Sequence, residues 1–332
     1  MGLLLNCIKE KDRSVVPIWL MRQAGRYLPE FREIRKKNPN FINLCLNEKL
    51  SEEITLQPIK RFGFDAAIIF SDILMVPFGM GQSVEFKKDL GPILGEVNIE
   101  TLMDLSDNQF SAKLNPIYKL LNNLSNHDDL KNKDLIGFVG APWTILVYMI
   151  NRKSPKRGLP DNFFNNPNID KLIKLIVRFL KIHIKNQIDS GANLIQIFDS
   201  WASLLTSDID KYIYEPMIEI VNFVQSQGIP VICFPKGISN YKDYCDKIKP
   251  NLISIDFDVN PAQIIKDIDI PVQGGLDPKI LLTDKENLKK KTLEYLNIFK
   301  DHPYVFNLGH GILPNTEISM VEELIKLVRN FK

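Results

Sequence analysis

Short apolar runs alternate with longer segments of helical period along this chain, and this alternation restricts the fold more than any other feature. Several runs, such as 66–70, are continuously apolar, as in strands that are buried on both faces. We expect strands over residues 16–20, 66–70, 135–140, 193–198, 229–234, 252–256, 271–274 and 304–308. Eight strands separated by helices in 332 residues favour an α/β fold, a (β/α)8 TIM-type barrel, over an open doubly wound sheet.

The segments between the expected strands carry helix signals. Apolar residues from Leu172 to Ile188 keep helical spacing, and Gly191 follows them as a stop signal. Because His183 shares this apolar face, we interpret it as structural. Ser319 and Glu322 have the spacing of a capping box, which predicts the start of the last helix.

No linker, repeat or low-complexity tract divides the sequence. The stretch 75–134 is long for one strand–helix unit, and we interpret it as an elaborated loop with added helices. We therefore expect a single barrel domain over residues 1–332. The sequence carries no glycine-rich phosphate loop that would indicate a nucleotide cofactor.

Composition excludes several classes of protein. Lys and Arg total 42 against 40 Asp and Glu, a formal net charge of +2 that gives no general attraction to nucleic acid. No run approaches the length of a membrane-spanning helix, so we expect no membrane association. The four cysteines have no metal-ligand spacing and imply no disulfide framework: Cys7, Cys45, Cys233 and Cys245. We expect a soluble, cytoplasmic protein without a bound metal.

Two arginines follow the first expected strand. Arg22 and Arg26 lie four positions apart, and Gly25 between them lets the backbone bend sharply. Converging guanidinium groups repel one another unless an anion lies between them, and arginine holds a carboxylate or phosphate through two parallel hydrogen bonds. The spacing therefore favours an anion-binding loop. The alternative is a pair of surface arginines, one of which is paired with Glu30.

Polar residues also follow other expected strands. Asp72 comes after the second strand, Ser200 after the fourth and His310 after the eighth, while Tyr148 lies a turn or two beyond the third. In a barrel the carboxyl ends of the strands meet at one rim, where functional residues gather. We therefore expect these side chains to lie close to the two arginines.

Each of these four residues also has a structural interpretation. Asp72 and Ser200 stand where helix N-caps are common. An aromatic residue such as Tyr148 on an apolar helix is commonly part of the core, and a loop histidine such as His310 is commonly hydrogen-bonded to backbone. The residues alone leave these alternatives open.

Several segments together resemble one family. The segment Trp19–Phe31 resembles the N-terminal signature of the uroporphyrinogen decarboxylases, haem-pathway enzymes that trim the acetate side chains of a tetrapyrrole to methyl groups. Further segments similar to that family follow in its order over nearly the whole chain: Phe70–Leu74, Gly140–Thr144, Phe198–Ala202, Gln273–Pro278 and Asn307–Gly311.

The resemblance implies decarboxylation of the four acetate groups of uroporphyrinogen III to give coproporphyrinogen III. It implies that Asp72 accepts hydrogen bonds from the pyrrole N–H groups and offsets the cation that develops on the ring. Arg22 and Tyr148 are the other catalytic residues that it implies. The substrate-binding residues that it implies are Arg22, Gln23, Ala24, Gly25, Arg26, Asp72, Tyr148, Ser200 and His310.

The resemblance implies no cofactor, because a protonated pyrrole can accept the electron pair that carbon dioxide leaves behind. The expected ligand is a polyanionic tetrapyrrole, and the expected assembly is a homodimer with facing clefts. Two alternatives remain. Barrel methyltransferases of the corrinoid or cobalamin-independent type share the fold, but they resemble one another in a zinc site of His and Cys, and the chain has no His-x-Cys pair. A non-catalytic tetrapyrrole-binding protein would need the arginines but not both Asp72 and Tyr148.

Overall fold

The computed structural model describes residues 1–87, 90–156 and 158–331, and a curled parallel sheet lies at its centre. The sheet has seven strands in the order β1-β4-β5-β6-β7-β8-β9, and neighbouring strands are parallel. The strands are β1 (Ala66–Ile68), β4 (Asp134–Gly140), β5 (Leu194–Asp199), β6 (Val231–Pro235), β7 (Leu252–Ile255), β8 (Val272–Gly274) and β9 (Tyr304–Val305). The predicted α/β class is confirmed, and the last seven predicted strands all overlap these elements.

The prediction of a regular strand over 16–20 is wrong. Only Ile18 pairs, through an isolated parallel bridge to Phe306 beside β9. Pro17 has no N–H to donate to a ladder, and the N–H of Ile18 donates instead to the Asp65 carboxylate at 2.7 Å. Regular pairing therefore gives a curled half-barrel rather than a complete eight-stranded barrel.

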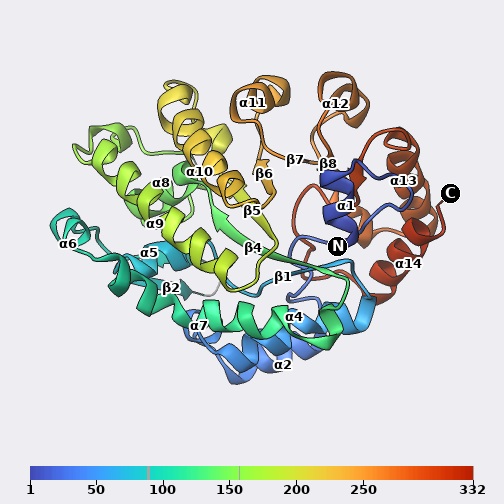
Figure 1. The fold of residues 1–332 in the computed structure, drawn as a ribbon, viewed down its shortest axis with the longest axis horizontal. Coiled ribbons are helices and arrows are strands. Elements are labelled where there is room, and N and C mark those ends of the chain that lie inside the picture. Colours follow the sequence, from blue (N-terminus) through green and yellow to red (C-terminus); the bar gives the residue numbers. More distant parts are fainter. Residues whose placement is uncertain (88–89, 157, 332) are drawn as a thin grey trace.

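Helices form an arc around the outside of the sheet, from α4 and α7 through α9 and α10 to α13 and α14 (Figure 1). The helices are α1 (Leu3–Lys9), α2 (Pro29–Lys37), α3 (Phe41–Cys45), α4 (Glu48–Phe62), α5 (Met75–Gly79), α6 (Ile99–Met103), α7 (Asp107–Ser125), α8 (Pro142–Asn151), α9 (Ile169–Asp189), α10 (Glu215–Ser226), α11 (Tyr241–Ile248), α12 (Pro261–Asp267), α13 (Lys285–Ile298) and α14 (Ile318–Arg329). Short 3-10 turns cover Asp128–Leu130, Phe163–Asn165, Ala202–Leu204 and Pro278–Leu282, and a π-helical turn covers Asp210–Tyr214.

The inside of the curled sheet is filled by apolar side chains from its strands. They form one buried cluster with residues of α1: Leu4, Leu5, Cys7, Ile8, Trp19, Met21, Ala66, Ile136, Leu194, Ile232, Phe234, Leu252 and Val305. The N–H groups of Leu4 and Leu5 donate to the carboxylate of Asp134, the first residue of β4, at 2.9 and 3.2 Å. Helix α1 therefore covers the amino end of the strands, and the carboxyl end is left for a site.

The stretch 75–134 contains added helices, as predicted, and also a feature that the sequence did not predict. Helices α5, α6 and α7 lie within it. Between α5 and α6, strands β2 (Val84–Lys87) and β3 (Gly91–Leu94) pair antiparallel as a separate two-stranded sheet.

Two helix predictions have opposite outcomes. The capping box at Ser319 and Glu322 is wrong, because α14 already begins at Ile318 after Glu317, and the Ser319 hydroxyl donates to the Glu317 carboxylate at 3.3 Å.

The structural interpretation of His183 is confirmed. Its ring is buried in α9 against the Tyr118 hydroxyl, 3.0 Å from Nδ1, and burial lowers its pKa to about 3.

Candidate active site

The loop that carries Arg22 is fixed from both sides. The N–H of Met21 donates to Asn307 Oδ1 at 2.9 Å, and the N–H of Ile312 donates to the carbonyl of Met21 at 2.9 Å. Directly after Met21, Arg22 adopts a left-handed backbone with a φ of 61°. A Cβ added to Gly311 would lie 2.3 Å from Arg22 Cδ, so only glycine leaves room for this side chain.

The two arginines are not engaged by the acidic residue next to them. Glu30 forms a two-point ion pair with Arg61, at 2.8 and 3.1 Å, so the expected alternative in which one of the two arginines pairs with Glu30 is wrong. Both Arg22 and Arg26 are exposed. The largest cause of the lowered pKa of Arg22 is that the surrounding residues shield its guanidinium from water. The Asp72 carboxylate opposes this shift, and the positive charge of Arg26 adds to it. Arg22 is therefore close enough to both Asp72 and Arg26 for their charges to act on it.

Asp72 lies beyond the carboxyl end of β1 and is partly buried. Its Oδ1 accepts the N–H of Leu74 at 2.9 Å. Helix α5 nevertheless begins after Leu74 without a side-chain cap, so the interpretation of Asp72 as a helix N-cap is wrong. Burial raises the pKa of Asp72 to about 6, while the Leu74 bond and the charge of Arg22 oppose that rise.

Tyr148 combines a core position with a polar neighbourhood. Its side chain is buried on α8, and its ring packs edge-on against Trp201 with the centroids 5.9 Å apart. Burial raises the pKa of its hydroxyl, the side chains of Ser154 and Trp201 oppose the rise, and the charges of Asp72 and Arg22 both act on it. The hydroxyl therefore belongs to the same group as Asp72 and Arg22.

Ser200 directly follows β5 and is partly buried. Its interpretation as a helix cap is wrong, because the 3-10 turn that follows is preceded by Trp201 and has no side-chain cap.

The side chain of Gln23 points into the protein. Its side-chain amide accepts from Leu20 N–H at 3.2 Å and donates to the carbonyl of Ala66 at 3.0 Å. Of the residues between the two arginines, Gln23 is buried, while Ala24 and Gly25 are partly exposed.

His310 is held by a local hydrogen bond that fixes its chemistry. Its Nδ1 accepts the N–H of Gly311 at 2.8 Å. Burial and the charges of Arg22 and Lys236 lower its pKa to about 4. The ring is therefore neutral near pH 7, and because Nδ1 accepts, Nε2 carries the proton and is a donor. Such an N–H suits a carboxylate ligand.

Lys236 is a rim residue that the sequence reasoning missed. It follows β6 directly, is partly buried, and its N–H donates to the carbonyl of Asp199 at 3.0 Å. Its charge acts on His310 and also on Asp256, which follows β7. The loop of His310 passes against the same place, since a Cβ on Gly309 would lie 2.3 Å from the N atom of Phe257. The signal available in the sequence was the position of Lys236 two residues after the expected strand 229–234.

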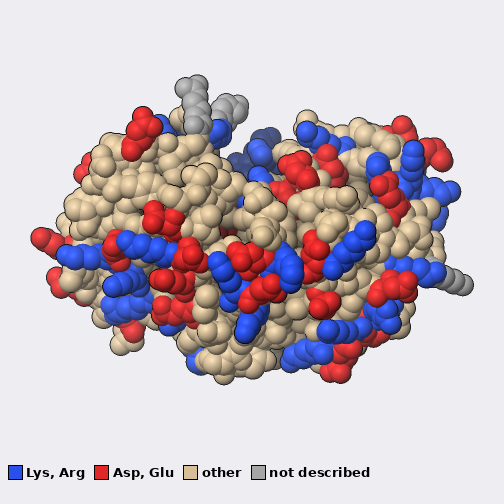
Figure 2. Space-filling view, turned by 90° about the horizontal axis from the view of Figure 1, so that it is seen from above, with Lys and Arg blue, Asp and Glu red and all other residues tan. Residues whose placement is uncertain are grey.

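Charges of both signs are mixed over the face shown in Figure 2, in keeping with the small net charge. A hollow at the top of that view contains Lys or Arg side chains.

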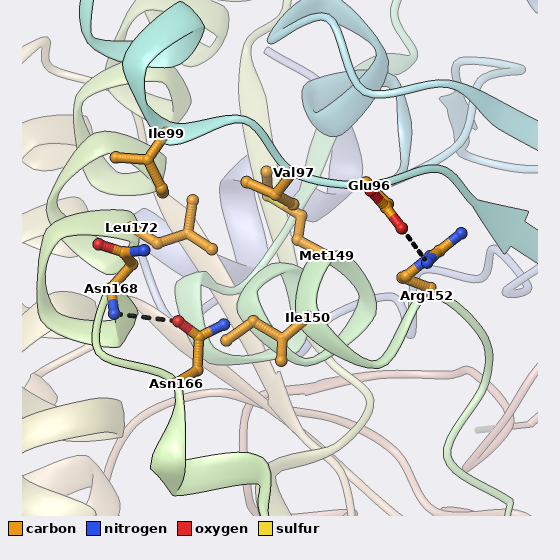
Figure 3. A pocket seen from close by; sticks show the side chains of 9 residues that line it. All are labelled: Glu96, Val97, Ile99, Met149, Ile150, Arg152, Asn166, Asn168 and Leu172. Carbon is orange, nitrogen blue, oxygen red and sulfur yellow. Dashed lines mark hydrogen bonds and ion pairs between the residues drawn. The ribbon is translucent and has the colours of Figure 1, made fainter.

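A separate cavity of about 230 Å³ lies beside the end of α8 (Figure 3). Its lining includes the ion pair of Arg152 and Glu96 at 3.2 Å, together with apolar side chains such as Leu172. Because its cation is already paired and no predicted site residue lines it, this cavity is not the candidate site.

Within 1–87, 90–156 and 158–331, no three His, Cys, Asp or Glu side chains are grouped so as to hold a metal ion. Over the same residues, no helix combines the length and the apolar character needed to cross a bilayer.

The fold and site together define a class: α/β proteins with a curled parallel sheet that has arginine, lysine and aspartate side chains beyond the carboxyl ends of its strands. This chain belongs to the uroporphyrinogen decarboxylase family, because the family model described as Uroporphyrinogen decarboxylase (URO-D) matches residues 1–331. The uroporphyrinogen decarboxylase of Rickettsia bellii is 41% identical over 342 residues, which cover 100% of this chain and 99% of the relative. That of Campylobacter jejuni is 41% identical over 334 residues, 97% of each chain.

A solved structure extends the comparison to the fold alone. A methyltransferase from Methanosarcina mazei superposes with a TM-score of 0.77 over 98% of this chain and 96% of its own, at 15% sequence identity. This methyltransferase therefore shares the architecture of the chain, while the family match assigns the chain to the decarboxylase family.

Proposed function

We propose that this chain converts uroporphyrinogen III to coproporphyrinogen III by removing four acetate carboxyl groups as carbon dioxide, as a carboxy-lyase of haem biosynthesis. The observation that supports this best is the gathering of Arg22, Asp72 and Tyr148 at the carboxyl end of the sheet in a member of this family. A polyanionic macrocycle needs cations at its edge and an acceptor for its central N–H groups.

Asp72 serves the centre of the macrocycle. With a pKa of about 6 it is mostly ionised at neutral pH, and the Leu74 bond holds one of its oxygens. The other oxygen is available to accept pyrrole N–H groups. When a pyrrole is protonated at a ring carbon, the cation forms above this carboxylate, which stabilises charge where it develops in the transition state.

The electron pair that decarboxylation releases goes into the substrate itself. The bond between the acetate methylene and its carboxyl carbon breaks, and its two electrons neutralise the protonated pyrrole. Protonation of the exocyclic carbon and loss of the ring proton then leave a methyl group. Each acetate therefore consumes one proton and yields one carbon dioxide. The Tyr148 hydroxyl stands beside Asp72 as a donor for the reacting acetate.

The edge of the macrocycle is held by positively charged and N–H groups. Arg22 and Arg26 bind carboxylates from one side of the rim through two-point hydrogen bonds. Lys236 and the Nε2–H of His310 bind carboxylates from another side, and Ser200 contacts the substrate between them. Gln23, Ala24 and Gly25 shape the loop that presents the arginines.

The test is anaerobic incubation of the purified protein with uroporphyrinogen III, followed by oxidation and chromatography of the porphyrins. We expect products that descend from the octacarboxylate to the tetracarboxylate, unchanged after exhaustive chelation. Binding without product would support the tetrapyrrole-binding alternative. Loss of turnover under chelation that zinc restores would overturn the cofactor-free mechanism.

We also propose three properties on the strength of the family resemblance. The chain forms one domain in which residues 16–20 take the place of an eighth strand. Two copies form a homodimer with facing clefts, and the protein acts in the cytoplasm.

A further inference from the structure

Two family-like segments that lie far apart in the sequence, 140–144 and 198–202, meet through one hydroxyl group. Thr144 Oγ1 donates to Asp199 Oδ1 at 2.6 Å and accepts the backbone N–H of Trp201 at 3.1 Å. The indole N–H of Trp143 donates to the carbonyl of Trp201 at 3.0 Å. The first turn of α8 is thereby tied to the loop that leaves β5.

Both candidate substrate residues on this side of the cleft depend on these bonds. Ser200 lies between Asp199 and Trp201, and each of these neighbours is bonded to Thr144. Tyr148 lies four residues after Thr144, on the same face of α8. Its ring packs against Trp201. A shift of Thr144 would therefore move the serine and the tyrosine together.

The Asp199 carboxylate is poorly suited to a purely structural role. Thr144 and Asp199 are both buried. Only Oδ1 of Asp199 is bonded, and Oδ2 has no partner among the described residues. Burial raises the pKa of Asp199 to about 7. A buried carboxylate with one unbonded oxygen is less favourable for folding than an apolar residue of similar size, so a contribution to the site would account for its presence.

We propose that Asp199 and Thr144 are positioning residues, which hold Ser200 and Tyr148 at the places where the substrate meets them. Neither touches the substrate; Asp199 orients the Thr144 hydroxyl, and Thr144 fixes the backbone of Trp201. The inference rests on the proposed function of the cleft.

The test compares Thr144→Val with Thr144→Ser. Valine keeps the shape of threonine but removes both hydrogen bonds, whereas serine keeps the hydroxyl. We expect Thr144→Val to lower kcat by about tenfold or more with a smaller change in KM, and Thr144→Ser to restore kcat to within about threefold. Asp199→Asn should fall between the two, because an amide oxygen can still accept from Thr144.

Thr292→Val is the matched control. Thr292 is a buried threonine of α13 whose hydroxyl has no partner among the described residues. Urea unfolding of all variants measures how much each loses in stability. If Thr144→Val loses stability but keeps the kcat and KM of Thr292→Val, the hydrogen bonds are structural and the inference is overturned.

A double-mutant cycle tests the route of the effect. If Thr144 acts through Tyr148 and Ser200, then Thr144→Val should add little to the loss already seen in a Tyr148→Phe, Ser200→Ala protein. Full additivity would overturn the inference. If the wild-type protein produces no coproporphyrinogen at all, the proposed function fails instead. If it is active and Tyr148→Phe and Ser200→Ala have no effect, the roles given to these two residues fail, and the positioning inference fails with them.

Discussion

The two sides of the proposed site are built in opposite ways. On one side, Arg22 and Arg26 are exposed, Arg22 has a left-handed backbone, and the nearby acid Glu30 is bound to Arg61 instead. On the other side, Thr144 is buried and bonded to its protein neighbours on both sides. The two arginines that we propose meet the ligand are thus not paired with Glu30, whereas the hydroxyl that we propose sets the geometry has protein partners.

This contrast predicts that variants on the first side change function with little loss of stability. Asp72→Asn should show the largest effect. The amide keeps the size of the side chain but removes the charge that offsets the pyrrole cation, so turnover should fall by about 10² or more while product affinity changes less. Steady-state kinetics and product binding measure the two quantities. Asp258→Asn, at an exposed rim position, is the control; normal turnover in a folded Asp72→Asn protein would remove Asp72 from the mechanism.

The arginines should come next. Removing a charge-assisted contact costs about 1.5–3 kcal/mol, so Arg26→Ala should weaken substrate binding about 10- to 100-fold. Arg26→Lys should weaken it less, because the point charge remains without the planar fork, and Arg22 should follow the same order. Stability without substrate should be unchanged or higher, since two nearby cations no longer repel.

Arg61→Ala is the contrasting variant, because Arg61 is paired with Glu30. It should lower stability slightly and leave binding intact. Should the Arg26 variants unfold while their affinity for the porphyrinogen stays normal, the distinction between the two kinds of arginine would be lost.

Lys236→Ala should have a smaller effect, about a three- to tenfold rise in KM with kcat nearly unchanged, because a partly buried lysine provides a single point contact. Lys242→Ala is its control, since Lys242 is exposed on α11 and paired with Asp246. Equal KM values for the two variants would place Lys236 outside the substrate-binding surface.

The smallest expected effect is on stability as a function of pH. Burial raises the pKa of Asp72 from 3.8 to about 6, so the folded protein binds this proton more tightly than the unfolded chain. The contribution of Asp72 to stability is therefore fully present below about pH 4 and is lost as the pH rises through 6. Relative to Asp72→Asn, the wild-type protein should become less stable between pH 4 and 7 in urea unfolding. A constant difference between the two would show that the pKa is not raised.

The sequence was most informative about candidate residues that follow the end of an expected strand. Asp72, Ser200 and His310 were predicted to share one rim because parallel strands end at the same edge. Arg22 was predicted there from a strand over 16–20 that pairs only at Ile18. It was less informative where a contact joins distant segments. The bond from Thr144 to Asp199 spans 55 positions, and the Asp65 bond that replaces a ladder at Ile18 spans 47. Neither hydrogen bond leaves a signal in the local pattern of apolar and polar residues.

The backbone at Arg22 has a consequence for any attempt to improve this protein. A residue other than glycine in the left-handed region costs about 1–2 kcal/mol, so a screen that selects only for heat resistance would favour glycine at this position. Such a screen would discard the guanidinium that we propose binds the substrate. Thermostable variants should therefore be selected for catalysis in the same round, with this codon held fixed.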